Sequence, residues 1–204
     1  MNRGFVPLLG AVLLTGTGAL SWATDGFRTV TSEGARRLAI EREAPPIPDV
    51  RLVDQDGRMF SLGDYRGRAV LVDFIYTRCP TVCGVLGDDF RSVLAEWRGR
   101  AADEAVDLLS ISFDPAHDDV DALKLYGERY DATAPAWRIA KPVDRSSLET
   151  LLRTFGVVTI PDGFGGFIHN SAVYLVNRQG HLIGAFDPDA PAALAAKVRR
   201  AAQG

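Results

Sequence analysis

The chain has two cysteines, Cys79 and Cys83, and their spacing allows them to take part in the same chemistry. Pro80 suits the first turn of a helix, so we expect Cys79 at the helix N-terminus and Cys83 one turn further along the same face. At that spacing the two Cα atoms lie about 6 Å apart, which suits a disulfide or the shared binding of one soft metal ion. The helix dipole and the cation of Arg78 favour thiolates here, whereas two packing cysteines are the alternative.

A histidine is the candidate partner of the two thiols. His169 directly precedes the apolar run 172–176, which we predict as a strand. Cu(I) prefers thiolates and accepts an imidazole as a third ligand, so copper is the metal to consider. An ordinary loop histidine is the alternative for His169. We interpret His117 and His181 as loop and hairpin residues outside the site.

Asp73 is unusual because its neighbours on both sides are apolar. A carboxyl group in a buried strand has a raised pKa or a partner of opposite charge. Asp73 lies six residues before Cys79, where it could exchange protons with the thiols. Pairing with a lysine or arginine at the sheet edge is the alternative. Asp114 ends the next predicted strand, where a loop-capping role competes with a role in the site.

The elements that would position these residues alternate between strand and helix patterns. We predict strands over 69–76, 105–113 and 137–140, and helices over 81–97, 118–130 and 144–155, the last capped by Asp144 or Ser146. We predict hairpins over 50–61 and 171–186, a glycine-rich loop over 156–170 and a final helix over 190–202. This order indicates an α/β, thioredoxin-like fold, with a central mixed sheet flanked by helices and an extra N-terminal hairpin. The cysteines then lie beyond the carboxyl end of the first long strand, where ligand sites form in such sheets. In this fold the loop before the strand 172–176, which carries His169, faces the cysteine helix.

The composition excludes several classes of protein. The 204 residues are 47% hydrophobic and 24% charged, which is the balance of a globular and not of a disordered chain. The formal net charge of −3 leaves no basic surplus for phosphates, so we expect no nucleic-acid partner. Two cysteines are too few for a small scaffold held together by disulfides.

The first 23 residues have the pattern of an export segment. Arg3 precedes an apolar run that ends in small residues at Ala23, which is typical of a signal peptide, and a retained membrane anchor is the alternative. The proline-rich residues 45–48 favour an extended linker over 24–48, followed by a single domain over 49–204. Both interpretations place that domain outside the cytoplasm, in an oxidising compartment.

Three segments and one histidine together resemble a known family. Residues 74–83, FIYTRCPTVC, resemble the F-x-Y-T-x-C-P-x-x-C signature of the Sco/SenC copper-chaperone family. Residues 110–118 look like its S-V-D-P-x-x-D segment, residues 54–57 match its opening hairpin, and His169 matches its metal-binding histidine. The resemblance covers roughly residues 45–200. The chain departs from the family at Gly84, where proline is common, and at Ile168 and Asn170, where Asp and Ser are often found.

The resemblance implies a thioredoxin-like fold and copper, as Cu(I) or Cu(II), bound by Cys79, Cys83 and His169. It implies a metallochaperone that assists assembly of the dinuclear copper centre of a terminal cytochrome c oxidase. The implied partners are the copper-bearing oxidase subunit and another chaperone that loads the copper. The implied location is the bacterial periplasm, with the chain exported or anchored to the inner membrane by its N-terminal segment.

Two other functions compete with this interpretation. The first is a periplasmic thiol–disulfide oxidoreductase that uses Cys79 and Cys83 as a redox pair to reduce the cysteines of an oxidase subunit. Such an enzyme would usually carry C-x-x-C and a loop proline, whereas this chain has C-x-x-x-C and a histidine, which favours metal. The second is a thiol peroxidase, which would want a threonine where Pro80 stands. We therefore expect a non-enzymatic metallochaperone for which thiol–disulfide exchange remains available.

Overall fold

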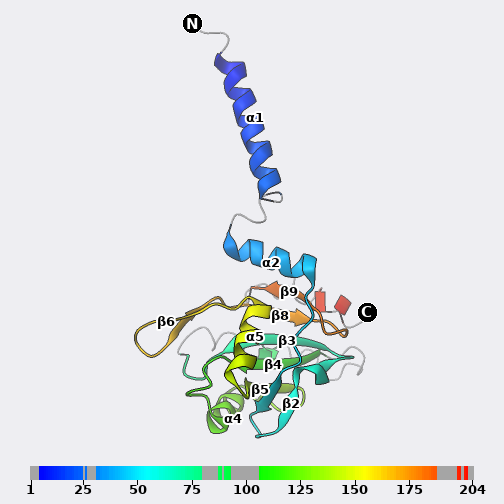
Figure 1. Cartoon of the computed structure of the whole chain (residues 1–204), viewed down its shortest axis with the longest axis vertical. Helices are drawn as coiled ribbons and strands as arrows, with labels where there is room; N and C mark the ends of the chain where they lie inside the picture. Colours follow the sequence, from blue (N-terminus) through cyan, green and yellow to red (C-terminus); the bar gives the residue numbers. More distant parts are fainter. Residues whose placement is uncertain are drawn as a thin grey trace.

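One mixed β-sheet organises the chain. The computed structural model describes residues 5–24, 26, 31–79, 87, 88, 90–92, 106–187, 197, 198, 200 and 201. Within this part, the sheet has the order β2-β1-β5-β4-β3-β8-β9 (Figure 1). Its strands are β1 (Arg51–Asp54), β2 (Met59–Ser61), β3 (Ala69–Ile75), β4 (Val106–Ser112), β5 (Trp137–Pro142), β8 (Val173–Val176) and β9 (Leu182–Phe186).

The strand directions explain why the sheet is mixed. β3, β4 and β5 are parallel, and both hairpins join this centre antiparallel, β1–β2 beside β5 and β8–β9 beside β3. The carboxyl ends of β3 and β4 therefore lie side by side at one edge of the sheet. This arrangement confirms the predicted α/β architecture and its added N-terminal hairpin.

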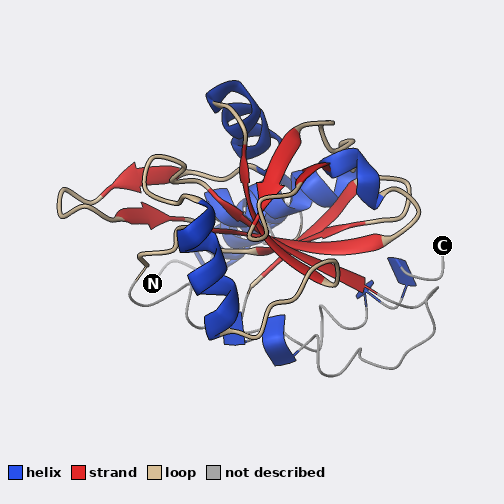
Figure 2. Cartoon of the chain, turned by 90° about the horizontal axis from the view of Figure 1, so that it is seen from below, coloured by secondary structure: helices blue, strands red, loops and turns tan. Residues whose placement is uncertain are grey.

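Helices cover both faces of the sheet, as Figure 2 shows. On one face, Phe74 of β3 packs edge-on against Phe155 of α5 (Arg145–Phe155), with ring centroids 5.2 Å apart. On the other face, Trp137 contacts Phe90 at 5.7 Å and Tyr130, which caps α4 (Val120–Arg129), at 6.4 Å. β3 and β4 are buried along their whole length, as expected for strands covered on both sides.

The ends of α5 follow from local chemistry. The Asp144 side chain accepts a hydrogen bond from the Ser147 N–H, so Asp144 is the N-cap, the first of the two predicted candidates, and Ser146 is not. Gly156 ends the helix with a left-handed φ of 65°, a conformation that glycine adopts at little cost. The segment that carries His169 begins after Gly156.

The prediction of an extended linker over 24–48 is wrong for its central part. Residues Ser32–Glu43 form helix α2, whose N-cap Thr31 accepts a hydrogen bond from the Gly34 N–H. α2 packs on β9, and Arg37 forms a bidentate ion pair with Asp187. The prolines begin only at Pro45, after the helix has ended at Ala44 in a left-handed conformation. The linker is thus partly a packed helix.

The glycine-rich segment 156–170 is not a simple loop, which corrects a second prediction. It contains a two-stranded antiparallel ribbon of β6 (Thr159–Pro161) and β7 (Phe167–His169), hereafter the β6–β7 ribbon. Asp162 holds its turn by accepting hydrogen bonds from the N–H groups of Phe164 and Gly166. The glycines lie in this turn, while the β-branched Ile160 and Ile168 pair across the two strands.

The remaining predictions concern the chain ends and the cysteine helix. Helix α1 (Phe5–Ala23) extends away from the sheet ahead of α2 (Figure 1). Among the described residues, no helix combines the length and the apolar character needed to cross a bilayer. Cleavage or anchoring of residues 1–23 stays a prediction. The helices predicted over 81–97 and 190–202 lie largely outside the described residues, although the described parts of both are helical.

Candidate functional site

Cys79 lies just beyond the carboxyl end of β3. Its backbone N–H donates to the Tyr76 carbonyl at 3.1 Å, which closes a turn after the strand. The cysteine is half-buried and packs against the hydrophobic core. Cys83, the second predicted thiol, lies outside the described residues.

A buried carboxylate fixes this turn. Asp118 is fully buried and accepts hydrogen bonds from the Thr77 N–H at 3.0 Å and from the Thr77 hydroxyl at 2.6 Å. The Ser112 hydroxyl at the end of β4 donates to the same carboxylate. The turn that leads to Cys79 is therefore tied to the loop that follows β4.

A second carboxylate pairs with the cation beside the cysteine. Asp114 lies 2.9 Å from an Arg78 guanidinium nitrogen and 2.9 Å from Nδ1 of His117. The Arg78 charge, which the sequence suggests as a stabiliser of thiolates, is thus shared with a buried partner. His117 is a loop residue, as predicted, and its ring contacts the Asp114 carboxylate. The Asp114 carbonyl also accepts hydrogen bonds from the N–H groups of His117 and Asp118, so Asp114 stabilises the loop.

His169 lies at the end of β7 and faces inward from the ribbon. Its ring packs on Phe113 with centroids 5.1 Å apart and on Tyr76 at 6.3 Å. Phe167 lies beside it and contacts the same two rings, each at 5.3 Å. Ile168 points the other way and is 65% exposed, so strand alternation directs the imidazole toward the sheet.

The imidazole of His169 has no polar partner among the described residues. Both ring nitrogens are buried, and neither forms a hydrogen bond within the part of the chain that the structure describes. Burial also lowers the pKa of His169, which favours the neutral imidazole. A buried neutral imidazole without a partner is costly unless it binds something, and a metal ion is a partner that this form accepts. The donor chemistry therefore fits a metal ligand.

Tyr76 connects the two described candidates. Its carbonyl accepts the Cys79 N–H, and its ring contacts the His169 ring. Cys79 and His169, which are 90 positions apart in the sequence, thus lie at the same edge of the sheet. Among the described residues, which omit Cys83, no three His, Cys, Asp or Glu side chains are grouped to hold a metal. The three-ligand set and the Cys79–Cys83 pair remain predictions.

Asp73 is buried in β3 with 1% of its surface exposed. Neither carboxyl oxygen forms a hydrogen bond to any described residue. Burial raises the pKa of Asp73 to about 7, and the Ser110 hydroxyl, close by but outside good hydrogen-bond geometry, opposes the shift in part. Among the described residues Asp73 forms no ion pair, so the predicted pairing with a lysine or arginine finds no support there, and proton exchange with the thiols stays a prediction.

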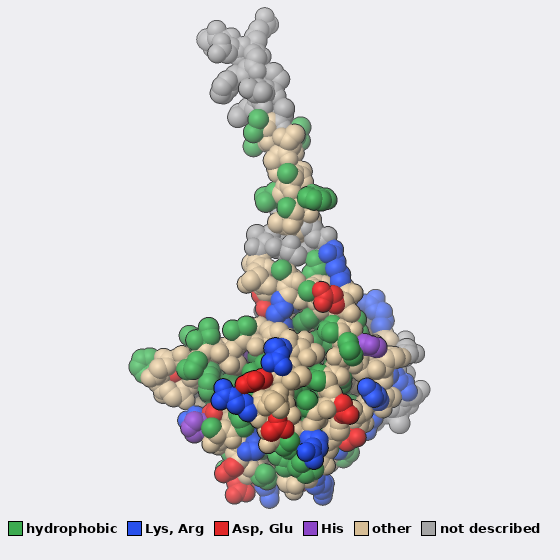
Figure 3. All heavy atoms as spheres, viewed as in Figure 1, with side chains coloured by type: hydrophobic (Ala, Val, Ile, Leu, Met, Phe, Trp, Pro, Cys, Tyr) green, Lys and Arg blue, Asp and Glu red, His purple; other side chains and the backbone are tan. Residues whose placement is uncertain are grey.

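The β6–β7 ribbon exposes an apolar outer face. Ile160 and Ile168 pair across the two strands and are 55% and 65% exposed, and Phe164 at the turn is almost fully exposed. Figure 3 shows hydrophobic side chains gathered on the projecting ribbon. The inner face carries Phe167 and His169, so the two faces of one short strand have separate roles.

The sequence pattern assigns no role to several residues of this edge, although Tyr76 and Thr77 stand in the motif 74–83. Thr77, Tyr76 and Phe113 acquire their roles through contacts between distant segments. The sequence does single out Asp118, because it lies in the D-P-x-x-D segment, but Asp118 also stands at the start of the helix predicted over 118–130, where a capping role is expected; the observed N-cap of α4 is Asp119. His181 is in the β8–β9 hairpin, as predicted. Its backbone N–H donates to Asn177 Oδ1.

Comparison with known proteins identifies the family. The family model described as SCO1/SenC matches residues 41–203, from the end of α2 to the C-terminal segment. The chain belongs to the SCO1/SenC family. This confirms the resemblance drawn from the cysteine motif, and the match spans Cys79, Cys83 and His169.

Individual SCO1/SenC relatives agree with the assignment. The SCO1 protein homolog of Bacillus subtilis is 30% identical over 132 residues, which cover 64% of this chain and 67% of that protein. The structure of Bradyrhizobium japonicum ScoI with copper bound has a TM-score of 0.64 and 26% identity, covering 77% of this chain and 99% of that one.

A further SCO1/SenC structure is that of BsSco, a cytochrome c oxidase assembly protein in which a disulfide switch was identified. It has a TM-score of 0.64 and 25% identity, and covers 77% of this chain and 93% of that one. Together the fold and these similarities confirm the predicted thioredoxin-like architecture.

Proposed function

We propose that this chain is a copper-binding assembly factor for a terminal cytochrome c oxidase. Cys79, Cys83 and His169 would hold the copper, and the copper-bearing oxidase subunit would receive it. The observation that carries the proposal is the buried imidazole of His169, which has no hydrogen-bond partner among the described residues and lies at the edge where the Cys79 turn ends. The similarity to a ScoI structure solved with copper supports the same cargo.

The chemistry of these side chains suits copper. Thiolates are soft ligands that bind Cu(I) well, and an imidazole nitrogen extends the site to Cu(II). Metal binding needs the deprotonated ligands, and the lowered pKa of His169 supplies the neutral imidazole. The hydrogen bonds from Thr77 to Asp118 hold the Cys79 turn in place before copper arrives.

The alternative is a thiol–disulfide oxidoreductase. Two observations favour it: the i, i+4 spacing of the two cysteines and the disulfide switch of BsSco. His169 separates the two functions, because a disulfide between Cys79 and Cys83 does not need it. An assembly factor that delivers copper loses a ligand when His169 is removed, whereas an oxidoreductase keeps its redox pair.

The experiment compares His169→Ala with His181→Ala, a histidine of the β8–β9 hairpin, in a strain that lacks the parent gene. At limiting copper, we expect His169→Ala to fail in oxidase assembly while its cysteines still cycle between thiol and disulfide. His181→Ala should support assembly as the parent does. Full assembly with His169→Ala would reject copper delivery and favour the oxidoreductase.

The location and partners form part of the same proposal. Residues 1–23 would export the domain to the periplasm or anchor it to the inner membrane. There it would meet the oxidase subunit and a second copper chaperone that loads it.

A further inference from the structure

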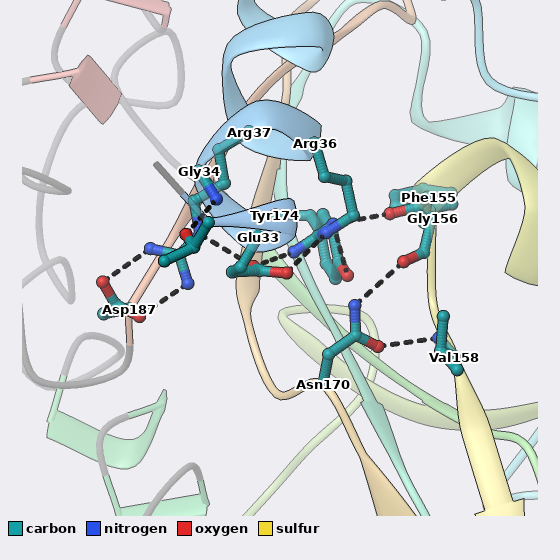
Figure 4. A network of polar contacts seen from close by, with 11 residues as sticks. Glu33, Gly34, Arg36, Arg37, Phe155, Gly156, Val158, Asn170, Tyr174 and Asp187 are labelled. Atoms are coloured by element: carbon teal, nitrogen blue, oxygen red, sulfur yellow. Dashed lines mark hydrogen bonds and ion pairs between the residues drawn. The ribbon is translucent and has the colours of Figure 1, made fainter. Parts of the chain in front are cut away.

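Asn170, the residue directly after His169, closes the base of the β6–β7 ribbon. Its side-chain oxygen accepts a hydrogen bond from the Val158 N–H at 2.7 Å, and its side-chain nitrogen donates to the Gly156 carbonyl at 3.0 Å. Its backbone N–H donates to the Val158 carbonyl at 3.3 Å. Figure 4 shows Asn170 reaching across to both residues.

These bonds act at the position that decides where His169 points. Val158 and Asn170 flank Thr159 and His169, which are directly opposite each other in the ribbon. A slip of one residue in β7 would turn His169 outward and Ile168 inward, because side chains alternate along a strand. The ribbon has only three paired positions, so the contacts at its base weigh heavily in fixing this register.

Arg36 of α2 binds the end of α5, next to the base of the ribbon. Its guanidinium donates to the Phe155 carbonyl at 2.9 Å and to the Tyr174 hydroxyl at 3.1 Å, and Glu33 pairs with it from the preceding turn of α2 (Figure 4). A Cβ added to Gly156 would lie 2.8 Å from the Arg36 side chain, so the two are in close contact. The end of α5 and the start of the ribbon are thus held in place.

We propose that Asn170 is a positioning residue for His169. It holds the ribbon in the register that turns the imidazole toward Tyr76 and Phe113 and toward the Cys79 edge, and Arg36 holds the strand start against which Asn170 acts. The proposal rests on the proposed function for its copper readout, and on the geometry alone for its structural readout. It also gives a role to a residue at which this chain departs from the family pattern.

The test uses the full chain with Asn170→Ala and a matched control. Asn177→Ala removes an asparagine whose side chain also binds the backbone, but in another hairpin, where Asn177 Oδ1 accepts hydrogen bonds from the N–H groups of Gln179 and His181. Asn170→Asp retains the acceptor for Val158 and loses the donor to Gly156, so it should be intermediate. It also serves as the second variant if Asn170→Ala does not fold.

The first readout needs no metal. In the parent and in Asn177→Ala, NMR should show nuclear Overhauser contacts between the ring protons of His169 and Phe113, and Asn170→Ala should lose or weaken them. Unchanged contacts in Asn170→Ala would overturn the positioning role. This result is independent of whether the protein binds copper.

The second readout is copper affinity in two backgrounds. We expect Asn170→Ala to weaken binding about tenfold, as for groups that orient a metal ligand, and to have less than about a twofold effect once His169 is alanine. An equal loss in both backgrounds would mean a general structural role and overturn the proposal. A parent that binds no copper would reject the proposed function, and the NMR contacts would still decide the role of Asn170.

Discussion

The Asp118 carboxylate binds Thr77 twice, through the backbone N–H at 3.0 Å and through the hydroxyl at 2.6 Å. This pair joins the ends of two neighbouring strands, since Thr77 follows β3 and Asp118 follows β4. Cys79 is two residues beyond Thr77, so the position of the thiol depends on a contact between segments 41 residues apart.

Thr77→Val should destabilise the fold by about 1–3 kcal/mol, because it leaves a fully buried carboxylate without one of its donors. Urea unfolding monitored by circular dichroism measures the change. Thr133→Val is the control, since Thr133 is exposed and its hydroxyl donates at a long 3.4 Å. Equal unfolding midpoints for both variants would contradict the anchoring role of Thr77.

Asp73→Asn should change the pH dependence of stability. The pKa of Asp73 is about 7 in the folded protein, against about 3.9 in an unfolded chain, so ionisation disfavours the folded state. This cost is absent below about pH 4, grows as the pH rises and is complete above about pH 7, where it amounts to at most about 4 kcal/mol. Relative to the parent, Asp73→Asn should therefore gain stability between pH 4 and 8.

The measurement is the free energy of unfolding across that pH range. Asp131→Asn is the control, because it removes an exposed carboxylate at a left-handed position that asparagine also tolerates. A difference between Asp73→Asn and the parent that stays constant from pH 4 to 8 would contradict the raised pKa.

Oxidation should abolish copper binding. The reduced protein is expected to bind one copper and the protein with a Cys79–Cys83 disulfide essentially none, because thiolates and not a disulfide are the ligands. Metal analysis after gel filtration of both forms, with the disulfide verified by mass spectrometry, gives the stoichiometry. Equal copper retention in both forms would exclude the thiols as ligands.

Residues 1–23 should direct export. A fusion of these residues to a reporter that is active only outside the cytoplasm is expected to be active, and a fusion that starts at residue 24 inactive. Sequencing the N-terminus of the mature protein then separates cleavage after Ala23 from a retained anchor. An inactive reporter with residues 1–23 in place would refute the export interpretation.

Elements whose stability is local follow directly from the sequence. The β-branched run over 69–76 predicts β3 (Ala69–Ile75), and Asp144 predicts the start of α5. Both predictions succeed because the apolar pattern of a strand and the cap of a helix depend on residues that are close together in the sequence. α2 does not follow in this way. Its Arg37 pairs with Asp187, 150 residues away, and the prolines after the helix suggest an extended chain instead.

The site also has features that the local sequence predicts and features that depend on distant contacts. Residue type and spacing identify Cys79, Cys83 and His169 as candidates, but the contact of His169 with Tyr76 and Phe113 depends on the ribbon register. That register is set by Asn170 and by a turn whose glycines suggest a structureless loop. The sequence therefore predicts the donors, and the structure shows how His169 reaches the edge where Cys79 lies.

The central claim is that Cys79, Cys83 and His169 hold the copper, and X-ray absorption spectroscopy of the copper-loaded, reduced protein tests it most directly. The account predicts a first shell of two sulfurs and one nitrogen in the parent, with the nitrogen lost in His169→Ala and retained in His181→Ala. A parent shell without nitrogen, or a nitrogen that persists unchanged in His169→Ala, would contradict it.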